Sequence, residues 1–423
     1  MTARPLSLAL YAAATGLLEP FAGWVLRARA RRGKEDPARL GERLGRAERS
    51  RPPGGLVWLH GVSVGESVSL LPLVAALRSG RPDLTLLVTS GTRTSAELLA
   101  ARLPTGVIHQ YAPVDAPGAV ARFLDHWRPD GGIFVESELW PNLILGAKRR
   151  GVRLALLSAR MTDASAKGWS RAPGAARTLL SAFDLVCAQD AETEARLSAL
   201  GARPGPRLNL KLVGEPLPCD DGELARMRAA IGERRVVLAA STHPTEEALI
   251  AGAFLKAAGE DDLLIVAPRH PERGEAVAAE LSGLGLASAL RSAGEALTPQ
   301  TRAYVADTLG ELGLFFRLAY VAVMGGGFAA GIGGHNPLEP ARLGMPILTG
   351  PSVFNAPQVY REMFDEVAAI EAVDAAALAR HLRGLLDYPR IARRIGEAAL
   401  SYAERQGEAL EAAMTRLEPL LPT

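Results

Sequence analysis

The feature that most constrains the fold is a glycine-rich segment between two short apolar runs. Residues 321–324 (VAVM) predict one buried strand, and Ile347 and Leu348 predict a second. The segment between them carries the glycines and then the sequence HNPLEP, residues 335–340. Strand, glycine loop, helix and strand in this order predict a βαβ unit. Its loop is expected at the carboxyl end of the sheet, where open α/β sheets bind ligands.

The residues after the glycines suit recognition of a phosphate and a sugar. Asn336 is expected to cap a helix that Pro337 begins, so that free N–H groups face the loop. Glu339, about one turn into this helix, offers a carboxylate to sugar hydroxyls. A glycine loop after a strand can also be only a tight turn. Asparagine, proline and glutamate at these offsets favour a ligand-binding loop.

The chain of 423 residues suits two α/β domains, because single cores stop growing near roughly 250–300 residues. We expect an N-terminal anchor and basic flank over residues 1–34. A Rossmann-like, acceptor-side domain is expected over 35–213, and a nucleotide-sugar-binding one over 220–423. Residues 214–219, which contain two prolines, are the best linker candidate.

Composition removes several classes of function. The net charge of +2 gives no electrostatic basis for binding nucleic acid, and 5% aromatic residues are few for base stacking. Cys187 and Cys219 make neither a disulfide framework nor a zinc site. The histidines are scattered along the sequence, and no spacing of metal-ligand residues is convincing, so no metal site is predicted.

Residues 6–26 are almost wholly apolar, apart from Glu19-Pro20, and a basic cluster over 27–34 follows. About 20 apolar residues can span a bilayer, and basic residues mark its cytoplasmic flank. A secretory signal would carry its positive charge before the apolar run. A single span and an in-plane helix on anionic lipid both stay open, although Glu19 weakens the first. The remaining alternative is a soluble helix packed on the protein.

Acidic residues follow two predicted strands of the first half. Strand 56–60 opens into a turn and a helix, with Glu66 at the helix mouth. This carboxylate suits a first-turn charge stabilised by the helix dipole. Its place at a strand exit also makes it a candidate general base for an alcohol. Strand 132–135 ends in Glu136-Ser137-Glu138, and which of these carboxylates reaches a ligand is left open.

Basic residues mark other strand exits. Lys211 lies inside the apolar, strand-like run 208–213, where its ammonium must either reach solvent or meet an anion. In the second half, Arg269 follows the strand 263–267 and offers a guanidinium suited to phosphate. Two α/β domains with polar strand exits facing one cleft predict a bilobal transferase fold.

Seven motifs in this order resemble the 3-deoxy-D-manno-octulosonic acid (Kdo) transferases of Gram-negative bacteria: HGVSVGE, VESELWPN, NLK, STHPTEE, APRHPERG, DTLGEL and GGHNPLEPA. The resemblance covers nearly the whole chain. It implies a GT-B fold of two Rossmann-like domains facing a cleft, with an N-terminal membrane-anchor helix. It also implies metal-independent, inverting transfer of Kdo from CMP-Kdo to a lipid A precursor of the lipid IVA type, in lipopolysaccharide core biosynthesis.

The resemblance further implies no cofactor besides the donor substrate CMP-Kdo, and no nucleic acid partner. The enzyme would lie at the inner (cytoplasmic) membrane, on an anionic surface, with its catalytic body on the cytoplasmic side. The alternatives are another GT-B transferase that uses a UDP-sugar on a membrane lipid, and a non-catalytic membrane-bound scaffold.

Carried over motif by motif, the resemblance assigns Glu66 as the general base, and Glu136 and Lys211 as groups that stabilise the transition state. The CMP of the donor would be held by Pro268, Arg269, Leu309, Gly310, Glu311, Asn336, Pro337, Leu338 and Glu339. Fixed positive groups and helix N-termini would then neutralise the donor's phosphate and carboxylate without a cation.

Two departures from the family pattern lie near the expected donor site. The family's G-G-S loop is here Gly325 to Gly327, and its G-P-H is Gly350-Pro351-Ser352. A hydroxyl and an imidazole are therefore missing, while the catalytic set is complete.

Overall fold

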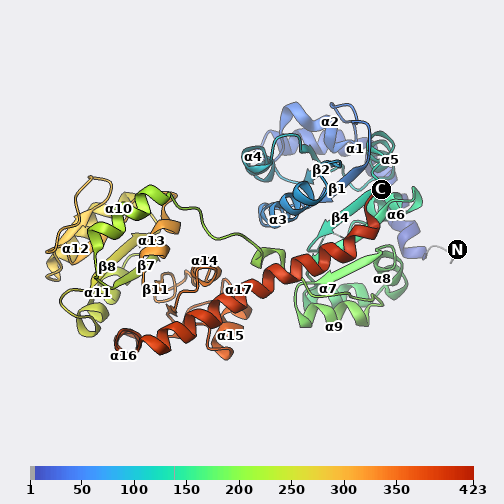
Figure 1. The fold of residues 1–423 in the computed structure, drawn as a ribbon. Coiled ribbons are helices and arrows are strands. Elements are labelled where there is room, and N and C mark those ends of the chain that lie inside the picture. Colours follow the sequence, from blue (N-terminus) through green and yellow to red (C-terminus); the bar gives the residue numbers. More distant parts are fainter. Residues whose placement is uncertain (1–4, 138) are drawn as a thin grey trace. The chain divides into compact units, whose positions relative to one another are not determined.

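The computed structural model describes residues 5–137 and 139–423, which form two compact units (Figure 1). The N-terminal unit comprises Met1–Gly214 and Gln406–Thr423, and the C-terminal unit comprises Glu215–Arg405. Each unit contains one parallel sheet with helices packed on it, as the sequence predicted.

The sheet of the N-terminal unit has the order β3-β2-β1-β4-β5-β6, the strand order of a Rossmann domain. Its strands are β1 (Leu56–His60), β2 (Thr85–Ser90), β3 (Ile108–Tyr111), β4 (Gly131–Val135), β5 (Arg153–Ala159) and β6 (Leu185–Ala188). The helices are α1 (Leu6–Ala30), α2 (Leu40–Arg43), α3 (Val64–Gly80), α4 (Arg93–Arg102), α5 (Pro117–Trp127), α6 (Pro141–Arg149), α7 (Asp163–Ser170), α8 (Pro173–Leu180) and α9 (Ala191–Ala199). Short 3-10 helices are η1 (Pro37–Arg39) and η2 (Leu210–Leu212).

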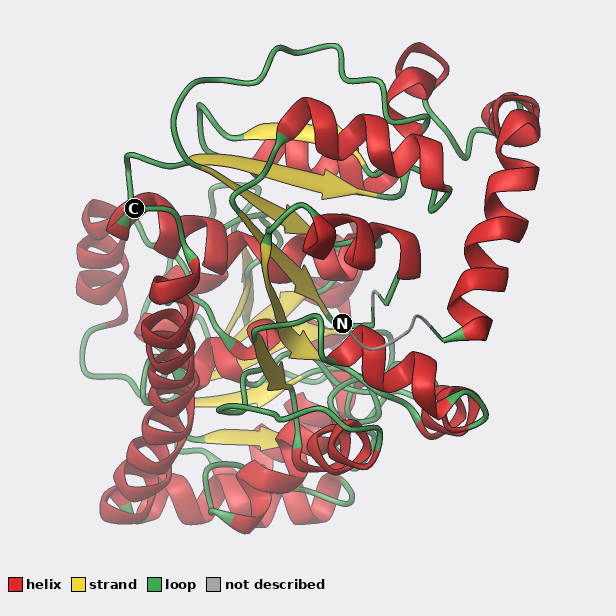
Figure 2. Cartoon of the chain, turned by 90° about the vertical axis from the view of Figure 1, so that its right-hand side faces the viewer, coloured by secondary structure: helices red, strands yellow, loops and turns green. Residues whose placement is uncertain are grey.

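The strands of this sheet are buried on both faces, with helices on either side (Figure 2). In β1, Leu56 and Trp58 belong to one apolar cluster, while Val57 and Leu59 belong to another. A parallel sheet covered on both faces requires such continuous apolar runs, which explains why the strand sequences show no polar alternation.

The C-terminal unit contains a parallel sheet of order β13-β12-β11-β7-β8-β10-β9. Its strands are β7 (Val236–Thr242), β8 (Leu263–Pro268), β9 (Ser288–Leu290), β10 (Ala303–Val305), β11 (Val321–Met324), β12 (Ile347–Thr349) and β13 (Ile370–Glu371). The helices are α10 (Asp221–Ile231), α11 (Glu246–Ala257), α12 (Gly274–Gly283), α13 (Leu312–Leu318), α14 (Leu338–Ala341), α15 (Pro357–Asp365) and α16 (Ala375–Asp387), with η3 (Pro271–Arg273). Helix α17 (Pro389–Leu417) begins in this unit, and η4 (Glu418–Leu420) belongs to the N-terminal unit.

The end of the chain corrects one predicted boundary. The domain predicted over 220–423 is too long, because residues 406–423 belong to the N-terminal unit. In this segment Ala413, Leu417 and Leu421 are buried in the same apolar cluster as Leu77 of α3. Helix α17 therefore begins in one unit and ends in the core of the other.

Helix α1 is docked on the N-terminal unit by a polar stripe. Glu19 accepts hydrogen bonds from Gly118 N and from Arg122, each at 2.8 Å. The Tyr11 hydroxyl donates to Asp115 at 3.0 Å, and Thr15 Oγ1 accepts from the side chain of Asn142 at 2.9 Å. Glu19, whose charge argued against a membrane-spanning helix in the sequence, thus attaches α1 to the rest of the N-terminal unit.

Two histidines are held neutral inside the N-terminal unit. His60 is fully buried, with Nδ1 at 2.9 Å from Thr89 Oγ1. Burial, together with the positive charge of Arg43, lowers the pKa of His60 to about 3. Burial and the guanidinium of Arg39 lower the pKa of His109 to about 3 as well. Both rings exclude protons that they would bind in the unfolded chain.

We expect the free energy of unfolding of the N-terminal unit to decrease as pH falls from about 6.5 to about 3. The folded pKa values lie below the unfolded ones, so this stability is present above pH 6.5 and is lost on acidification. The slope approaches roughly 1.4 kcal/mol per pH unit for each histidine.

Urea unfolding followed by tryptophan fluorescence measures this, because all 5 tryptophans lie in the N-terminal unit: Trp24, Trp58, Trp127, Trp140 and Trp169. In a His60→Phe variant, the slope of the unfolding free energy with pH should decrease by the contribution of one histidine. A pH profile parallel to that of the wild type would contradict a buried neutral His60.

Candidate functional site

Glu66 lies at the mouth of α3 and is held by its own turn. The side chain of Ser63 caps the helix by accepting from Glu66 N at 3.3 Å. In return, Oε2 of Glu66 accepts from the backbone N–H groups of Ser63, at 3.2 Å, and Val62. Oε1 accepts no hydrogen bond from any described residue. The Glu66 carboxylate therefore stabilises the start of the helix, as one of the two sequence interpretations expected. The capping hydrogen bonds involve only Oε2.

Glu136 follows β4 in a left-handed conformation (φ 58°) and is buried. Its Oε1 lies 2.8 Å from Nζ of Lys211, so Glu136 is the anion that the lysine meets. Lys211 lies in the 3-10 helix η2, and the strand predicted over 208–213 is wrong. Asn209 Oδ1 accepts from Lys211 N at 3.2 Å and closes a turn instead. Glu138, the other carboxylate of this exit, lies outside the described residues.

These two acidic exits are neighbours in the N-terminal sheet. β1 and β4 pair in parallel, with His60 opposite Phe134. A β-carbon on Gly61 would lie 3.1 Å from Cβ of Glu66 and 3.3 Å from Val135, the residue before Glu136. A glycine at position 61 therefore lets the turn that carries Glu66 approach the end of β4.

In the C-terminal unit, four predicted donor-binding residues share one cavity of about 140 Å³. The cavity is lined by Ser241, Ala267, Pro268, Arg269, Pro271, Ala306, Thr308, Leu309, Gly310, Leu312 and Phe315. Pro268 and Arg269 end β8, while Leu309 and Gly310 follow β10, its neighbour in the sheet. The pairing of these strands brings the two motifs together.

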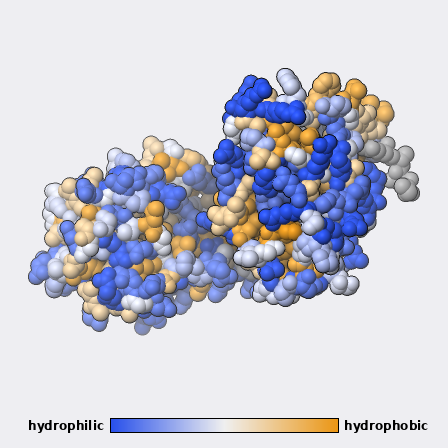
Figure 3. All heavy atoms as spheres, turned by 90° about the horizontal axis from the view of Figure 1, so that it is seen from above, coloured by the Kyte–Doolittle hydropathy of each residue, from blue (hydrophilic) through white to orange (hydrophobic). Residues whose placement is uncertain are grey.

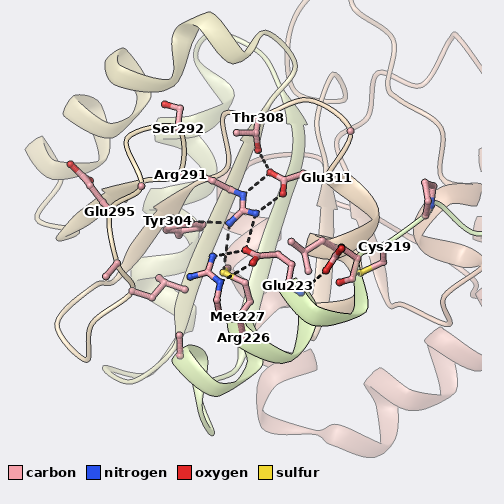
Figure 4. Close-up of a pocket in the computed structure, with 18 residues that line it drawn as sticks. Cys219, Glu223, Arg226, Met227, Arg291, Ser292, Glu295, Tyr304, Thr308 and Glu311 are labelled. Atoms are coloured by element: carbon pink, nitrogen blue, oxygen red, sulfur yellow. Dashed lines mark hydrogen bonds and ion pairs between the residues drawn. The ribbon is translucent and has the colours of Figure 1, made fainter.

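The predicted donor-binding residue Glu311 does not line this cavity. Its carboxylate accepts hydrogen bonds from Arg291 and Thr308, and Arg291 also binds Glu223 at 2.9 Å (Figure 4). The hydrogen bonds from Arg291 hold the pKa of Glu311 below its ordinary value. This network lines a neighbouring cavity of about 1070 Å³, which shares Thr308 and Gly310 with the smaller cavity but does not include Arg269. A role of Glu311 in holding CMP stays a prediction.

The Asn336 to Glu339 segment forms a shorter helix than the sequence suggested. α14 is one turn long, and it begins at Leu338 with Pro337 as its N-cap, one residue later than predicted. Asn336 Oδ1 still accepts from Leu338 N at 3.1 Å. Burial raises the pKa of Glu339, while a hydrogen bond from Asn336 and the charges of Arg342 and Arg269 oppose this shift. Arg269 therefore lies within electrostatic range of Glu339.

Three histidines that are scattered in the sequence converge after β7, β8 and β11. The rings of His243 and His335 are stacked, with centroids 5.1 Å apart and Nε2 atoms 2.9 Å apart. The centroid of His270 lies 5.9 Å from that of His243. Burial, aided by His243 and Arg269, lowers the pKa of His335 to about 4. No three His, Cys, Asp or Glu among the described residues are placed to hold a metal ion.

Gly327, where the family pattern has serine, lies in close contact with the turn after β12. A β-carbon on Gly327 would lie 2.6 Å from both Gly350 N and Thr349 Oγ1. One on Gly350 would lie 2.3 Å from the carbonyl of Gly327. The two backbones touch, so both positions require glycine and a serine at 327 would displace the turn after β12.

A family model described as 3-deoxy-D-manno-octulosonic-acid transferase (kdotransferase) matches residues 38–212. A 3-deoxy-D-manno-octulosonic acid transferase of Rickettsia bellii is 34% identical over 90% of this chain and 91% of that protein. A probable mitochondrial 3-deoxy-D-manno-octulosonic acid transferase of Arabidopsis thaliana is 38% identical over 81% of this chain and 79% of that protein.

The solved structure of a glycosyltransferase from Rickettsia africae matches with a TM-score of 0.54. The match covers 87% of this chain and 99% of that one at 11% sequence identity, so it shows the fold alone.

We expect Gly327→Ala to destabilise the C-terminal unit by about 1–3 kcal/mol, the usual cost of forcing an extra group into a packed site. The matched control is Gly252→Ala in α11, where a β-carbon meets no atom within 4 Å. This control should be neutral or stabilising by up to about 1 kcal/mol. Thermal unfolding followed by circular dichroism compares the two variants, and equal melting temperatures would contradict the contact between Gly327 and Gly350.

Proposed function

This chain belongs to the 3-deoxy-D-manno-octulosonic acid transferase family, and we propose that its acceptor is a lipid A precursor at the cytoplasmic membrane surface. It is a glycosyltransferase of the GT-B fold that transfers Kdo from CMP-Kdo in lipopolysaccharide biosynthesis. The observation that carries the proposal is the 34% identity across 90% of the chain. The motif residues of both units fall within this relationship.

The proposed reaction is a single displacement with inversion. Glu66 Oε1 takes the proton of the acceptor hydroxyl, and the acceptor oxygen then bonds to the anomeric carbon of Kdo. The bond from that carbon to the phosphate oxygen breaks, and its electron pair leaves with CMP. The capping hydrogen bonds to Oε2 support this role, because they fix the carboxylate and leave the other oxygen for the hydroxyl.

Fixed cations replace a metal ion in this proposal. Lys211, oriented by its ion pair with Glu136, would stabilise negative charge that develops on the donor. Arg269, which lines the 140 Å³ cavity with Pro268, Leu309 and Gly310, would hold the phosphate of CMP. Glu339 would accept hydrogen bonds from the ribose. No cofactor besides the donor substrate is required by this chemistry.

Helix α1 supports a location in the plane of the membrane surface. Its polar stripe is bound to the N-terminal unit, while large apolar side chains on it are exposed: Leu6, Leu10, Leu17, Leu18, Phe21, Trp24 and Val25. Figure 3 shows hydrophobic atoms gathered at the outer edge of the N-terminal unit. By length and composition the helix is also able to cross a membrane. A span would break the hydrogen bonds of Glu19, so we propose an in-plane anchor whose basic end, residues 27–34, contacts anionic lipid.

We expect Glu66→Gln to lower kcat by at least about 100-fold, because general bases typically contribute that much or more. CMP-Kdo affinity should change by less than about twofold, since the Kdo and CMP groups do not contact this carboxylate in the proposed reaction. Turnover is measured as CMP release with a lipid IVA acceptor, and affinity by calorimetry.

Near-normal turnover of Glu66→Gln would remove the assigned base. The same assay in EDTA tests the metal-free proposal, which loss of activity with rescue by Mg²⁺ would refute. Competition of UDP with CMP for binding distinguishes the alternative, a GT-B transferase that uses a UDP-sugar.

We expect the double substitution Leu17→Glu and Phe21→Glu to lower partitioning onto anionic vesicles by about 100-fold or more, because each apolar side chain contributes about 1.5–3 kcal/mol on burial. The matched control is Val373→Glu, an exposed apolar residue of the C-terminal unit. Vesicle co-sedimentation of the full chain measures this, and equal sedimentation of all three proteins would exclude α1 as the anchor.

A further inference from the structure

Two adjacent carboxylates begin helix α11, Glu246 and Glu247, and both are fully buried. Burying a carboxylate is costly unless hydrogen bonds or a cation compensate it. Neither residue has a part in the reaction proposed above. Their partners lie in the loops that follow β7, β8 and β11, and these loops carry the candidate donor-binding residues.

Glu246 accepts four backbone hydrogen bonds. Oε2 accepts from Gly326 N at 2.7 Å and from His243 N at 2.9 Å. Oε1 accepts from Phe328 N at 2.9 Å and from Ala329 N at 3.1 Å. Three of these four donors belong to the glycine loop, defined here as Gly325–Gly334. The loop is therefore wrapped around an anion of the protein itself.

The loop needs such a partner because its own sequence does not order it. Gly326, Gly331, Gly333 and Gly334 all have positive φ, and glycines lose more conformational freedom on folding than other residues. The Glu246 carboxylate, each oxygen of which accepts two hydrogen bonds, holds the first half of the loop. A hydrogen bond from Gly334 N to Gly326 O, at 2.9 Å, closes the loop. The loop then leads directly to His335 and Asn336.

Glu247 is bound by side chains rather than by backbone N–H groups. Its Oε1 accepts from the Thr242 hydroxyl at 2.9 Å and from Arg273 at 2.7 Å. Arg273 belongs to η3, which follows Arg269. Two consecutive residues of the STHPTEE motif thus brace the segment that follows Arg269 and the loop that leads to Asn336.

We infer that Glu246 is a positioning residue for the donor. It holds the glycine loop in its final shape before CMP-Kdo binds, and so sets the position of Asn336 and Glu339. This inference rests on the proposed function, because those residues are the ones assigned to the donor. The N–H groups of Gly326, Phe328 and Ala329 already donate to Glu246. The phosphate of the donor is therefore bound by other groups.

A purely structural role for Glu246 makes a different prediction, so a matched control is needed. Asp262 is also buried in the C-terminal unit, where it accepts from Gly259 N at 2.7 Å and binds Arg235 at 2.8 Å. It precedes β8, whereas Arg269 follows that strand, so Asp262 lies at the opposite end of the sheet. Asp262→Asn removes a buried charge without touching the glycine loop.

The experiment compares Glu246→Gln, Glu246→Asp and Asp262→Asn in the full chain. Hydrogen–deuterium exchange of residues 324–334 reports on the loop, and the KM values for CMP-Kdo and for the acceptor report on the site. In Glu246→Gln an amide group faces N–H donors, so exchange in the loop should accelerate. The donor KM should rise at least about tenfold, as expected for loss of one hydrogen bond to a charged group, with the acceptor KM within about twofold.

Glu246→Asp keeps the charge on a shorter side chain and should show smaller changes of the same kind. Asp262→Asn should lower the melting temperature and leave the donor KM unchanged. The inference is overturned if Glu246→Gln keeps wild-type loop exchange and donor KM, or if Asp262→Asn raises the donor KM equally. A wild-type protein that does not turn over CMP-Kdo would refute the proposed function alone, since loop exchange still decides the role of Glu246.

Discussion

Carboxylates that accept backbone N–H groups hold the loops at the carboxyl ends of both parallel sheets. Glu66 binds the turn after β1, and Glu246 binds the turn after β7 and the glycine loop after β11. Loops that leave a parallel sheet point several N–H groups the same way, and each needs an acceptor when it is buried. A carboxylate satisfies two or more of them at once. The positions of the candidate ligand-binding groups follow from these attachments.

The same kind of hydrogen bond holds different side chains in place in the two units. In the N-terminal unit the cap uses one oxygen of Glu66, and Glu136 at the next strand exit holds the ammonium of Lys211 in an ion pair. In the C-terminal unit the bracing carboxylates are fully buried, and Arg269, Pro268 and Leu309 line the adjacent cavity of about 140 Å³. The candidate base Glu66 and the candidate phosphate-binding Arg269 thus follow strands of separate sheets.

The sequence predicted the two Rossmann-like units and most strands, because strands buried on both faces are continuous apolar runs. Motifs directly after these strands also predicted which residues gather at each sheet edge. Other features depend on which strands pair, which a single sequence does not reveal. The stacking of His243 on His335 requires β7 to lie beside β11, and the partner of Glu311 is Arg291 in a distant segment. The strand expected around Lys211 is wrong for a local reason. The side chain of Asn209 accepts a hydrogen bond from Lys211 N and stabilises a 3-10 turn, although the surrounding residues are apolar.

The return of residues 406–423 to the N-terminal unit has a consequence for biosynthesis. One face of that sheet is covered in part by Ala413, Leu417 and Leu421. The ribosome makes the rest of this unit first, yet its core stays open until the whole C-terminal unit has been translated. The earlier-made half therefore matures last, and it exposes apolar surface to chaperones or lipid for as long as the later half takes to emerge.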